Sequence, residues 1–373
     1  MQSQDSDSST TTKPPSSRLM SLDALRGADM FLLVGIGSII RALPKISDNG
    51  VFQFLAGQCS HPKWHGYTIW DQIFPLFIFM MGVAMPFSFA KRLELGQKKA
   101  IYKHVAFRAV VLFLLGLVFW GRPVNTLTSG WGFYSVLYRI GFSYFFASLI
   151  VLNFKPRGQA IWVFGLVLGY YLAMRFIPVP GYGAGDFSEE GNLVVFVTAW
   201  LEGFIPPGTK HLLSPTLIPS VTNALIGALA GWWLRSEKSP NQKVKGLLLV
   251  GGLFIAFSFL ANLSVPFCKK LLTTSFTFLS CGISLFLLGL FYWMIDVRGY
   301  RRWAFFFVVV GMNSITIYLC NVYVDFRRLA GVFVGAFSKI LGSAEPLAVA
   351  VVSAGLIWLF LYFLYRRKIF LKV

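Results

Sequence analysis

Acidic residues are scarce in this chain of 373 residues, which has 15 Asp and Glu against 34 Lys and Arg. Charged residues make up 13% of the chain, about half of what a soluble domain carries. Hydrophobic residues make up 56%, and the mean hydropathy is +0.65. This composition excludes a soluble globular protein. The cationic residues lie in short clusters between apolar segments, so the net charge of +19 reports membrane topology, and no nucleic-acid partner is expected.

Cysteine is also scarce, with four residues at positions 59, 268, 281 and 320. Their spacing is neither CxxC nor a Cys/His zinc pattern, so we expect no metal site. A disulfide between Cys59 and Cys268 is one pairing that the sequence leaves open. The chain also lacks a Walker motif, GxSxG, HExxH and a dinucleotide-binding motif, and so gives no sign of the enzyme classes that these mark.

Apolar segments of about 20 residues, enough to cross a bilayer core, recur along nearly the whole chain. They predict an all-α polytopic membrane protein with about ten transmembrane helices. Residues 1–17 contain nine Ser or Thr and no apolar run, which predicts a disordered tail that is not a signal peptide. Residues 18–373 then form a single membrane domain. The predicted spans are 24–43, 68–90, 104–121, 133–153, 159–178, 215–235, 244–264, 271–295, 303–323 and 346–365.

Lys and Arg gather on one side of these spans. If the N-terminus is cytoplasmic, 22 of the 34 cationic residues fall on the cytoplasmic side. The connection between the fifth and sixth spans, on the opposite side, instead collects acids at Asp186, Glu189, Glu190 and Glu202. The positive-inside rule therefore predicts that both termini are cytoplasmic.

Ionisable residues at membrane depth cost about 2.5–3.5 kcal/mol each on insertion scales, so they mark candidate sites. Asp23, Arg26 and Asp29 are spaced to form one stripe on a helix at the cytoplasmic start of the first span. Such a stripe is either a structural cluster that snorkels to the interface or a guanidinium presented to a phosphate.

Two of the four histidines, His61 and His65, lie on the outer side just before the second span. Trp64 lies between them, and Asp71 follows just inside the span. An imidazole can take and give a proton near neutral pH, and a neighbouring carboxylate can orient it. An interfacial aromatic belt explains Trp64 equally well.

Three further polar residues lie inside predicted spans. Arg139, in the outer half of the fourth span, needs an acid or a pore, and Asp71 at similar depth is its nearest candidate partner. Asn223 in the sixth span and Asn313 in the ninth are buried amides, which usually bridge helices.

Several motifs follow in order after residue 18 and together resemble the catalytic membrane domain of the heparan-alpha-glucosaminide N-acetyltransferase family. The stretch from His61 to Gly82 is the most specific part. The motifs are Ser21-Leu22-Asp23-Ala24-Leu25-Arg26-Gly27, His61-x-x-Trp64-x-Gly66, Asp71-x-Ile73-Phe74-Pro75-x-Phe77-x-Phe79-x-x-Gly82, Val136-Leu137-Tyr138-Arg139-Ile140, Leu213-Ser214-Pro215-Thr216-Leu217-Ile218-Pro219-Ser220, Phe291-Tyr292-Trp293-x-x-Asp296 and Gly311-Met312-Asn313.

The resemblance implies transfer of an acetyl group from cytoplasmic acetyl-CoA to the amine of a glucosamine-type sugar on the outer side, in a bacterial cytoplasmic membrane. It makes His61, and not His65, the catalytic histidine, with Asp71 beside it. The lysosomal enzyme has a lumenal domain and a leading span that this chain lacks, so heparan sulfate is not the expected acceptor. Tyr138 stands where relatives commonly have Gln, and a family asparagine falls near Asn49. Candidates for acceptor or oxyanion contacts are Asn49, Trp64, Arg139, Asn223 and Asn313, and candidates for CoA contacts are Asp23, Arg26, Lys103 and Arg108.

Two chemical routes remain open at this point, because His61 can deprotonate the incoming ammonium or can itself carry the acetyl group. The alternative function is an amino-sugar or N-acetylglucosamine permease, although the two matching halves typical of transporters are not visible. Acetyl transfer to hydroxyls of cell-wall glycans is a third reading. The resemblance also makes a homodimer plausible, but nothing in this chain itself points to one.

Overall fold

The computed structural model describes residues 19–119, 136–203 and 214–371, and the predicted tail of residues 1–17 lies outside them. Helices make up most of the described part. Its strands are β1 (Pro178–Val179) and β2 (Gly183–Ala184), which pair antiparallel as a small hairpin. The all-α prediction is confirmed.

A π-helical segment, η1 (Leu32–Ile36), joins α1 to α2, and a second one, η3 (Tyr292–Val297), extends α12. The helices are α1 (Met20–Phe31), α2 (Gly37–Ala42), α3 (Gly50–Gln58), α4 (Ile69–Glu94), α5 (Lys98–Phe119), α7 (Val136–Asn153), α8 (Pro156–Phe176), α9 (Leu193–Glu202), α10 (Leu217–Arg235), α11 (Pro240–Asn262), α12 (Thr274–Phe291), α13 (Ala304–Met312), α14 (Ser314–Tyr323), α15 (Phe326–Gly335), α16 (Ser338–Leu341) and α17 (Glu345–Arg366).

Eight helices in the described ranges are long and apolar enough to cross a membrane, and the bent pair α13–α14 makes nine if it is one span. These nine coincide with nine of the ten predicted spans. The other prediction, 104–121, falls on α5, which is not among them. The polytopic membrane fold is therefore confirmed, while the number ten stays a prediction. The predicted span 303–323 is broken, because α13 and α14 meet at Asn313 with a bend of 69°.

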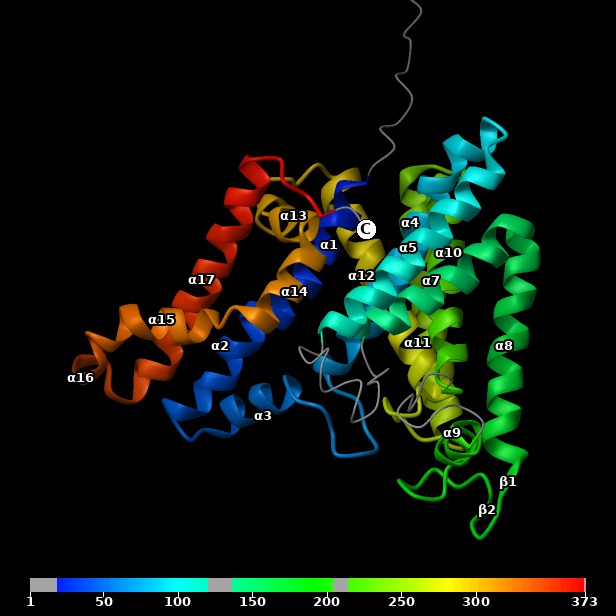
Figure 1. Ribbon diagram of the computed structural model, residues 1–373, viewed down its shortest axis with the longest axis horizontal. Coiled ribbons are helices and arrows are strands. Elements are labelled where there is room, and N and C mark those ends of the chain that lie inside the picture. The colour runs from blue at the N-terminus through cyan, green and yellow to red at the C-terminus, as the bar shows by residue number, and fades with distance from the viewer. Residues whose placement is uncertain (1–18, 120–135, 204–213, 372–373) are drawn as a thin grey trace, which may run out of the picture.

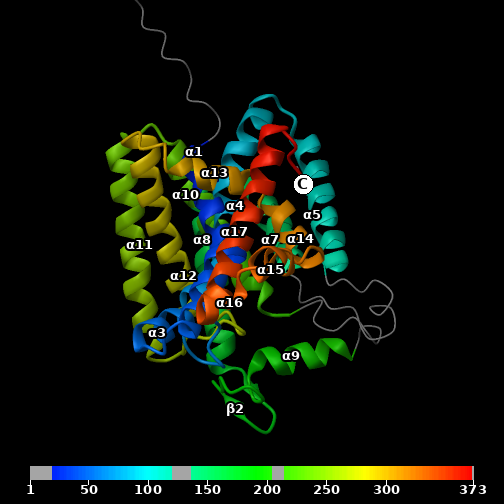
Figure 2. The ribbon, with the colours of Figure 1, turned by 90° about the vertical axis from the view of Figure 1, so that its left-hand side faces the viewer.

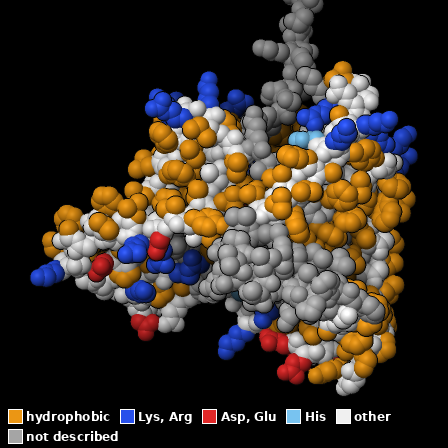
Figure 3. All heavy atoms as spheres, viewed as in Figure 1, with side chains coloured by type: hydrophobic (Ala, Val, Ile, Leu, Met, Phe, Trp, Pro, Cys, Tyr) orange, Lys and Arg blue, Asp and Glu red, His pale blue; other side chains and the backbone are white. Residues whose placement is uncertain are grey.

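The helices form two groups, with α1, α2 and α13–α17 on one side of Figure 1 and α4–α12 on the other. The start of α1 and the chain end marked C lie toward the same end, which we call the terminal end, together with the turns 94–98 and 235–240. Loops 59–68 and 263–273 lie at the opposite, distal end. On the face shown in Figure 3, Lys and Arg lie along the terminal end, and the acids lie in the distal half together with further Lys and Arg. This arrangement agrees with termini on one side, and the cytoplasmic assignment of that side remains a prediction.

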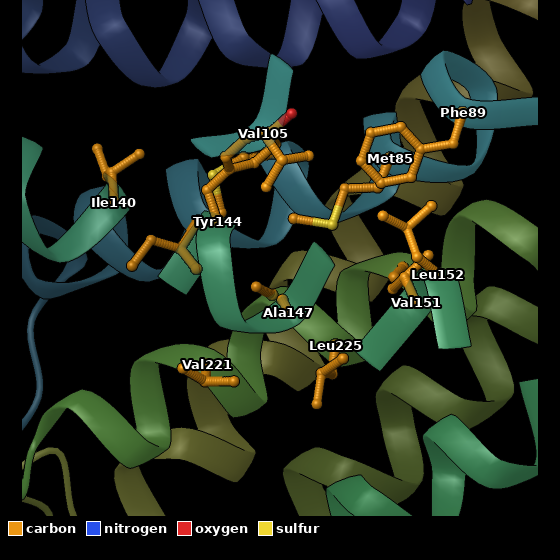
Figure 4. Packing of buried hydrophobic residues seen from close by; sticks show 14 of the residues in the cluster. Met85, Phe89, Val105, Ile140, Tyr144, Ala147, Val151, Leu152, Val221 and Leu225 are labelled. Carbon is orange, nitrogen blue, oxygen red and sulfur yellow. The ribbon is translucent and has the colours of Figure 1, made fainter. Parts of the chain in front are cut away.

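The larger group is packed around a buried cluster from α4, α5, α7 and α10, shown in Figure 4. Met85 and Phe89 of α4 contribute to it together with Tyr144 and Ala147 of α7 and Leu225 of α10. Each of these side chains is almost fully buried. Lipid tails are as apolar as Leu, so close packing and not exclusion from water holds such helices together.

Glycines allow α4 and α10 to approach closely. A Cβ added to Gly82 would lie within 3.0 Å of the carbonyl oxygen of Ala224, and one added to Gly227 would lie equally close to that of Phe79. Gly231 makes the same kind of approach to Val83. The pair Gly227/Gly231 is therefore a helix contact, as its small-xxx-small spacing suggests. The pair Gly165/Gly169 has the same spacing, but no described atom comes within 4 Å of an added Cβ there.

Gly227→Ala should therefore destabilise the folded protein, because the new methyl group clashes with backbone that cannot rotate away. We expect a loss of about 1–3 kcal/mol, typical of overpacking. Gly165→Ala is the matched control, and it should leave stability unchanged or raise it slightly, since Ala favours helix by about 1 kcal/mol over Gly. Thermal unfolding in detergent measures both. Equal melting temperatures for the two variants would contradict the close α4–α10 contact.

Candidate active site

Two loops meet at the distal end and build the floor of the site. Gly66, the glycine of HxxWxG, has φ +128°, a conformation that L side chains rarely adopt. Its N–H donates to the carbonyl of Phe267 at 2.9 Å, which joins loop 59–68 to loop 263–273. Leu272 turns the second loop with φ +46° and is itself buried. The motif glycine thus serves to place one loop against the other.

His61 and Asp71 form a close pair. The Nδ1 atom of His61 lies 2.7 Å from Oδ1 of Asp71. The Asp71 side chain is fully buried in the first turn of α4, and its Oδ2 accepts the N–H of Thr68 at 3.1 Å. A carboxylate at Nδ1 favours the tautomer with its proton there and leaves the lone pair on Nε2. The side chain of His61 is 49% exposed, so Nε2 can meet a substrate.

Lys269 completes this pair and was missed by the sequence analysis. Its Nζ lies 3.0 Å from Nε2 of His61 and 3.5 Å from Oδ1 of Asp71. Burial lowers the pKa of Lys269, and the neighbouring Asp71 partly opposes that shift. The cation in contact with Asp71 is therefore Lys269, where the sequence suggested Arg139. The one available signal was the pair Lys269-Lys270 on the predicted outer side, just before an apolar span.

These groups line a cavity of about 620 Å³, which we call the distal cavity. Trp64 lies in its wall, held by a hydrogen bond of 2.6 Å from Nε1 to the carbonyl of Phe187, with Nζ of Lys270 4.8 Å from its ring centre. Arg139 lines the cavity from α7 and donates to the hydroxyl of Thr216 at 2.9 Å. Helix α9 lies across the distal end in Figure 2, and Val194 and Thr198 are among the residues that it adds to the wall.

A second cavity of about 620 Å³, the terminal cavity, lies at the other end of the protein. Asp23 and Arg26 line it from α1, and their side chains are 3.5 Å apart. Arg108 lines it from α5, with its guanidinium over the ring of Tyr144 at 4.7 Å. Within the described chain, the buried Nε of Arg108 has no hydrogen-bond partner. The terminal cavity is thus cationic and can hold an anionic ligand.

The remaining cytoplasmic candidates lie apart from this cavity. Lys103 is exposed on α5 and is not among the described residues that line it, whereas the next residue, His104, does line it. Asp29 is 4% exposed in α1 and does not reach the cavity either, so the predicted stripe is divided between the cavity and the protein interior.

A small apolar cavity of about 170 Å³ lies between the two large ones. It shares His61, Phe74 and Lys269 with the distal cavity. It shares Phe77, Ile140 and Ile315 with the terminal cavity. The small cavity therefore adjoins both large ones. The small and terminal cavities lie between the two groups of helices, whereas the distal cavity is lined by α4, α7, α9 and the distal loops.

The three asparagine candidates have structural contacts of their own. Asn49 is exposed and caps α3, accepting the N–H of Val51 at 2.7 Å. Asn223 accepts a hydrogen bond from the thiol of Cys281 inside the bundle. Asn313 donates to the carbonyl of Ile369 at 3.1 Å, near the terminal end. None of these asparagines is among the described residues that line the distal cavity. None of them is therefore assigned an acceptor or oxyanion role.

Cys59 and Cys268 are both buried and free, and so are not paired with each other. No group of three or more His, Cys, Asp or Glu that could hold a metal ion is present within residues 19–119, 136–203 and 214–371.

Comparison with known proteins gives one family and two relatives. A family model described as a domain of unknown function, DUF5009, matches residues 18–205. Human heparan-alpha-glucosaminide N-acetyltransferase is 25% identical over 96% of this chain, and the mouse enzyme of the same name is 24% identical over 97%. The chain spans 60% of the length of the human relative and 62% of that of the mouse relative.

Proposed function

Because this chain belongs to the DUF5009 family and is similar along nearly its whole length to heparan-alpha-glucosaminide N-acetyltransferases, we propose that it is a membrane-embedded N-acetyltransferase. The observation that carries the proposal is the series of adjoining cavities, which leads from a cationic cavity at one end to the His61–Asp71 pair at the other. Such an arrangement suits a donor that enters on one side of a membrane and reacts on the other.

The proposed donor is acetyl-CoA, bound from the cytoplasmic side. Its phosphates would contact Arg26 and Arg108 in the terminal cavity, where guanidinium groups can hold phosphate oxygens. The pantetheine arm is narrow and would extend through the small cavity past Phe77 and Ile315. The thioester then reaches His61 while the nucleotide stays at the terminal end.

The proposed acceptor is the amine of a glucosamine-type sugar in the distal cavity. The carboxylate of Glu189 lines this cavity and can accept a hydrogen bond from the acceptor amine, while Trp64 offers an apolar face to a sugar ring. Arg139 lies in the same wall and can donate to sugar hydroxyls. The site would then be open to the outer side of a bacterial cytoplasmic membrane, given the predicted orientation.

The chemistry needs one base and one leaving group. In direct transfer, Nε2 of His61 takes one proton from the acceptor ammonium, and the free amine attacks the thioester carbon. The C–S bond breaks, the CoA thiolate takes the second proton, which the attacking nitrogen loses, and His61 releases the first proton to solvent. In the two-step route, Nε2 attacks the thioester carbon first, the C–S bond breaks so that CoA leaves, and an acetyl-imidazole forms; the amine then attacks that acetyl carbon and the bond from the carbon to Nε2 breaks. Asp71 holds Nδ1 in both routes. Mass spectrometry of the His61 peptide after incubation with acetyl-CoA alone distinguishes them, since only the second route leaves an acetyl group there.

The test of the proposal uses detergent-purified protein, labelled acetyl-CoA and a panel of amino sugars. We expect label to pass to a glucosamine-type amine. One observation favours the competing function of a permease, because the broken helix pair α13–α14 is a feature found in transporters. Failure to bind or consume acetyl-CoA, combined with sugar uptake in proteoliposomes, would overturn the enzyme proposal in favour of transport.

Arg108→Ala should raise the KM for acetyl-CoA about tenfold or more and leave kcat nearly unchanged, since a charge-assisted hydrogen bond contributes about 1.5–3 kcal/mol. The reason is that Arg108 would contact the nucleotide at a distance from the reacting carbon. Lys99→Ala is the matched control, because Lys99 is an exposed cation on the same helix and does not line the terminal cavity. A KM equal to that of the wild type for Arg108→Ala would remove Arg108 from the donor site.

A further inference from the structure

We propose that Lys269 is a positioning residue whose ammonium balances the buried carboxylate of Asp71 and so keeps the imidazole of His61 uncharged and able to act as a base. The inference rests on the proposed function for its kinetic consequence only. Its structural part concerns the charge state of three side chains and can be tested without turnover.

The ammonium of Lys269 lies close to both His61 and Asp71. Nζ of Lys269 lies 3.2 Å from Nδ1 and 3.0 Å from Nε2 of His61, so it is nearly equidistant from the two ring nitrogens. It also lies 3.5 Å from Oδ1 of Asp71, the oxygen that meets Nδ1. The three groups therefore form one cluster, although Lys269 is 208 positions from His61 in the chain.

Burial makes charge balance important in this cluster. The Asp71 side chain is fully buried, and that of Lys269 is 26% exposed. A buried carboxylate needs a cation, which either Lys269 or a protonated His61 can supply. With the ammonium already in place, a proton on His61 would put a second positive charge 3.0 Å away from it. The cluster is therefore neutral overall when the imidazole is uncharged.

The other charged groups that line the distal cavity are Glu189, Lys270 and Arg139. Glu189 and Lys270 form an ion pair of 3.7 Å at the rim, and each side chain is 59% exposed. Arg139 is anchored to Thr216, and its positive charge opposes protonation of Lys269. Arg139 thus adds to the positive potential around His61, whereas Lys270 is already paired with an acid. Lys269 is the cation that contacts both His61 and Asp71 in the described structure.

The direct experiment is carbethoxylation of His61, because diethyl pyrocarbonate reacts with the uncharged imidazole only. The extent of reaction is followed against pH at the His61 peptide by mass spectrometry. We expect Lys269→Met to move the reaction to higher pH by about one unit, which means about tenfold lower reactivity on the acidic side. Lys269→Arg keeps the charge and should restore the pH dependence of the wild type.

Lys270→Met is the matched control, since it removes the same charge from the next position but leaves the contacts of Lys269 intact. We expect the His61 titration to keep its wild-type position in this variant. Thermal unfolding confirms that each variant is folded under the conditions used. A folded Lys269→Met protein whose His61 reacts at the same pH as in the wild type would overturn the inference, as would a shift of equal size in Lys270→Met.

The kinetic readout is the pH profile of kcat/KM for acetyl transfer. The acidic limb of this profile should move to higher pH in Lys269→Met, in parallel with the carbethoxylation of His61. The two readouts separate the two proposals. A shift in carbethoxylation without any acetyl transfer in the wild type contradicts the proposed enzyme function and upholds the role of Lys269. Acetyl transfer with an unmoved acidic limb in Lys269→Met upholds the enzyme and contradicts the role of Lys269.

Discussion

Replacing His61 by Ala should lower the rate of acetyl transfer by about 10³-fold or more at saturating acetyl-CoA. A general base contributes about 10²–10⁴-fold, and loss of a covalent carrier would be at least as severe. Binding of acetyl-CoA should persist, because its phosphates are proposed to lie in the terminal cavity. Labelled transfer and equilibrium binding of acetyl-CoA, measured on the same preparation, give both quantities.

His65→Ala is the natural control for this experiment. His65 lies in the same loop and is exposed, and the contact described for it is with the edge of Trp64, whose ring centre is 6.2 Å away. It does not line the distal cavity, so its removal should leave the rate close to that of the wild type. Comparable losses in both variants would point to damage of loop 59–68 and against His61 as the reacting group.

Asp71→Asn should lower kcat by about 10²–10⁴-fold with little change in the affinity for acetyl-CoA. The amide can turn its N–H toward Nδ1 of His61 and so favour the tautomer that lacks the lone pair on Nε2. The same change in a serine-protease triad costs about 10⁴-fold for this reason. The variant also leaves Lys269 without its buried anion, so we expect lower thermal stability as well.

Steady-state kinetics and thermal unfolding in detergent test this second prediction together. Asp186→Asn is the matched control, because Asp186 is another acid of the distal end that does not line the cavity and instead accepts the N–H of Ser188 at 2.6 Å. A kcat for Asp71→Asn within a few-fold of the wild type would show that the carboxylate is structural only.

The membrane fold could be predicted because the relevant signal is local. A helix that crosses a bilayer must be apolar over about 20 consecutive residues, since unpaired polar groups are costly in lipid. The hydropathy of any 20-residue window shows whether this requirement is met. Nine spans predicted in this way coincide with candidate spans of the structure. The break at Asn313 was not predicted, because residues 304–323 are apolar enough overall to look like one span, and the packing of α13 and α14 is not visible in their composition.

The contact between His61 and Asp71 could also be predicted, because they are only ten positions apart and lie on either side of one helix start. Lys269 could not be predicted, since a lysine before an apolar span looks like any interfacial cation. The wrong partner, Arg139, was chosen on depth alone. Depth gives a coordinate along the membrane normal and says nothing about which helices are neighbours in the plane.

The sequence by itself determined that this protein is a helical membrane protein, and it determined the pair His61–Asp71. Each of these depends on composition or on residues close in the chain. The tertiary structure alone decided that Lys269 joins the pair, that Gly227 but not Gly165 is a helix contact, and that Asn223 and Asn313 lie away from the distal cavity. It also decided that a small cavity adjoins both the distal and the terminal cavity. These features depend on which helices meet in the plane of the membrane, and that is set by side-chain packing between segments far apart in the chain.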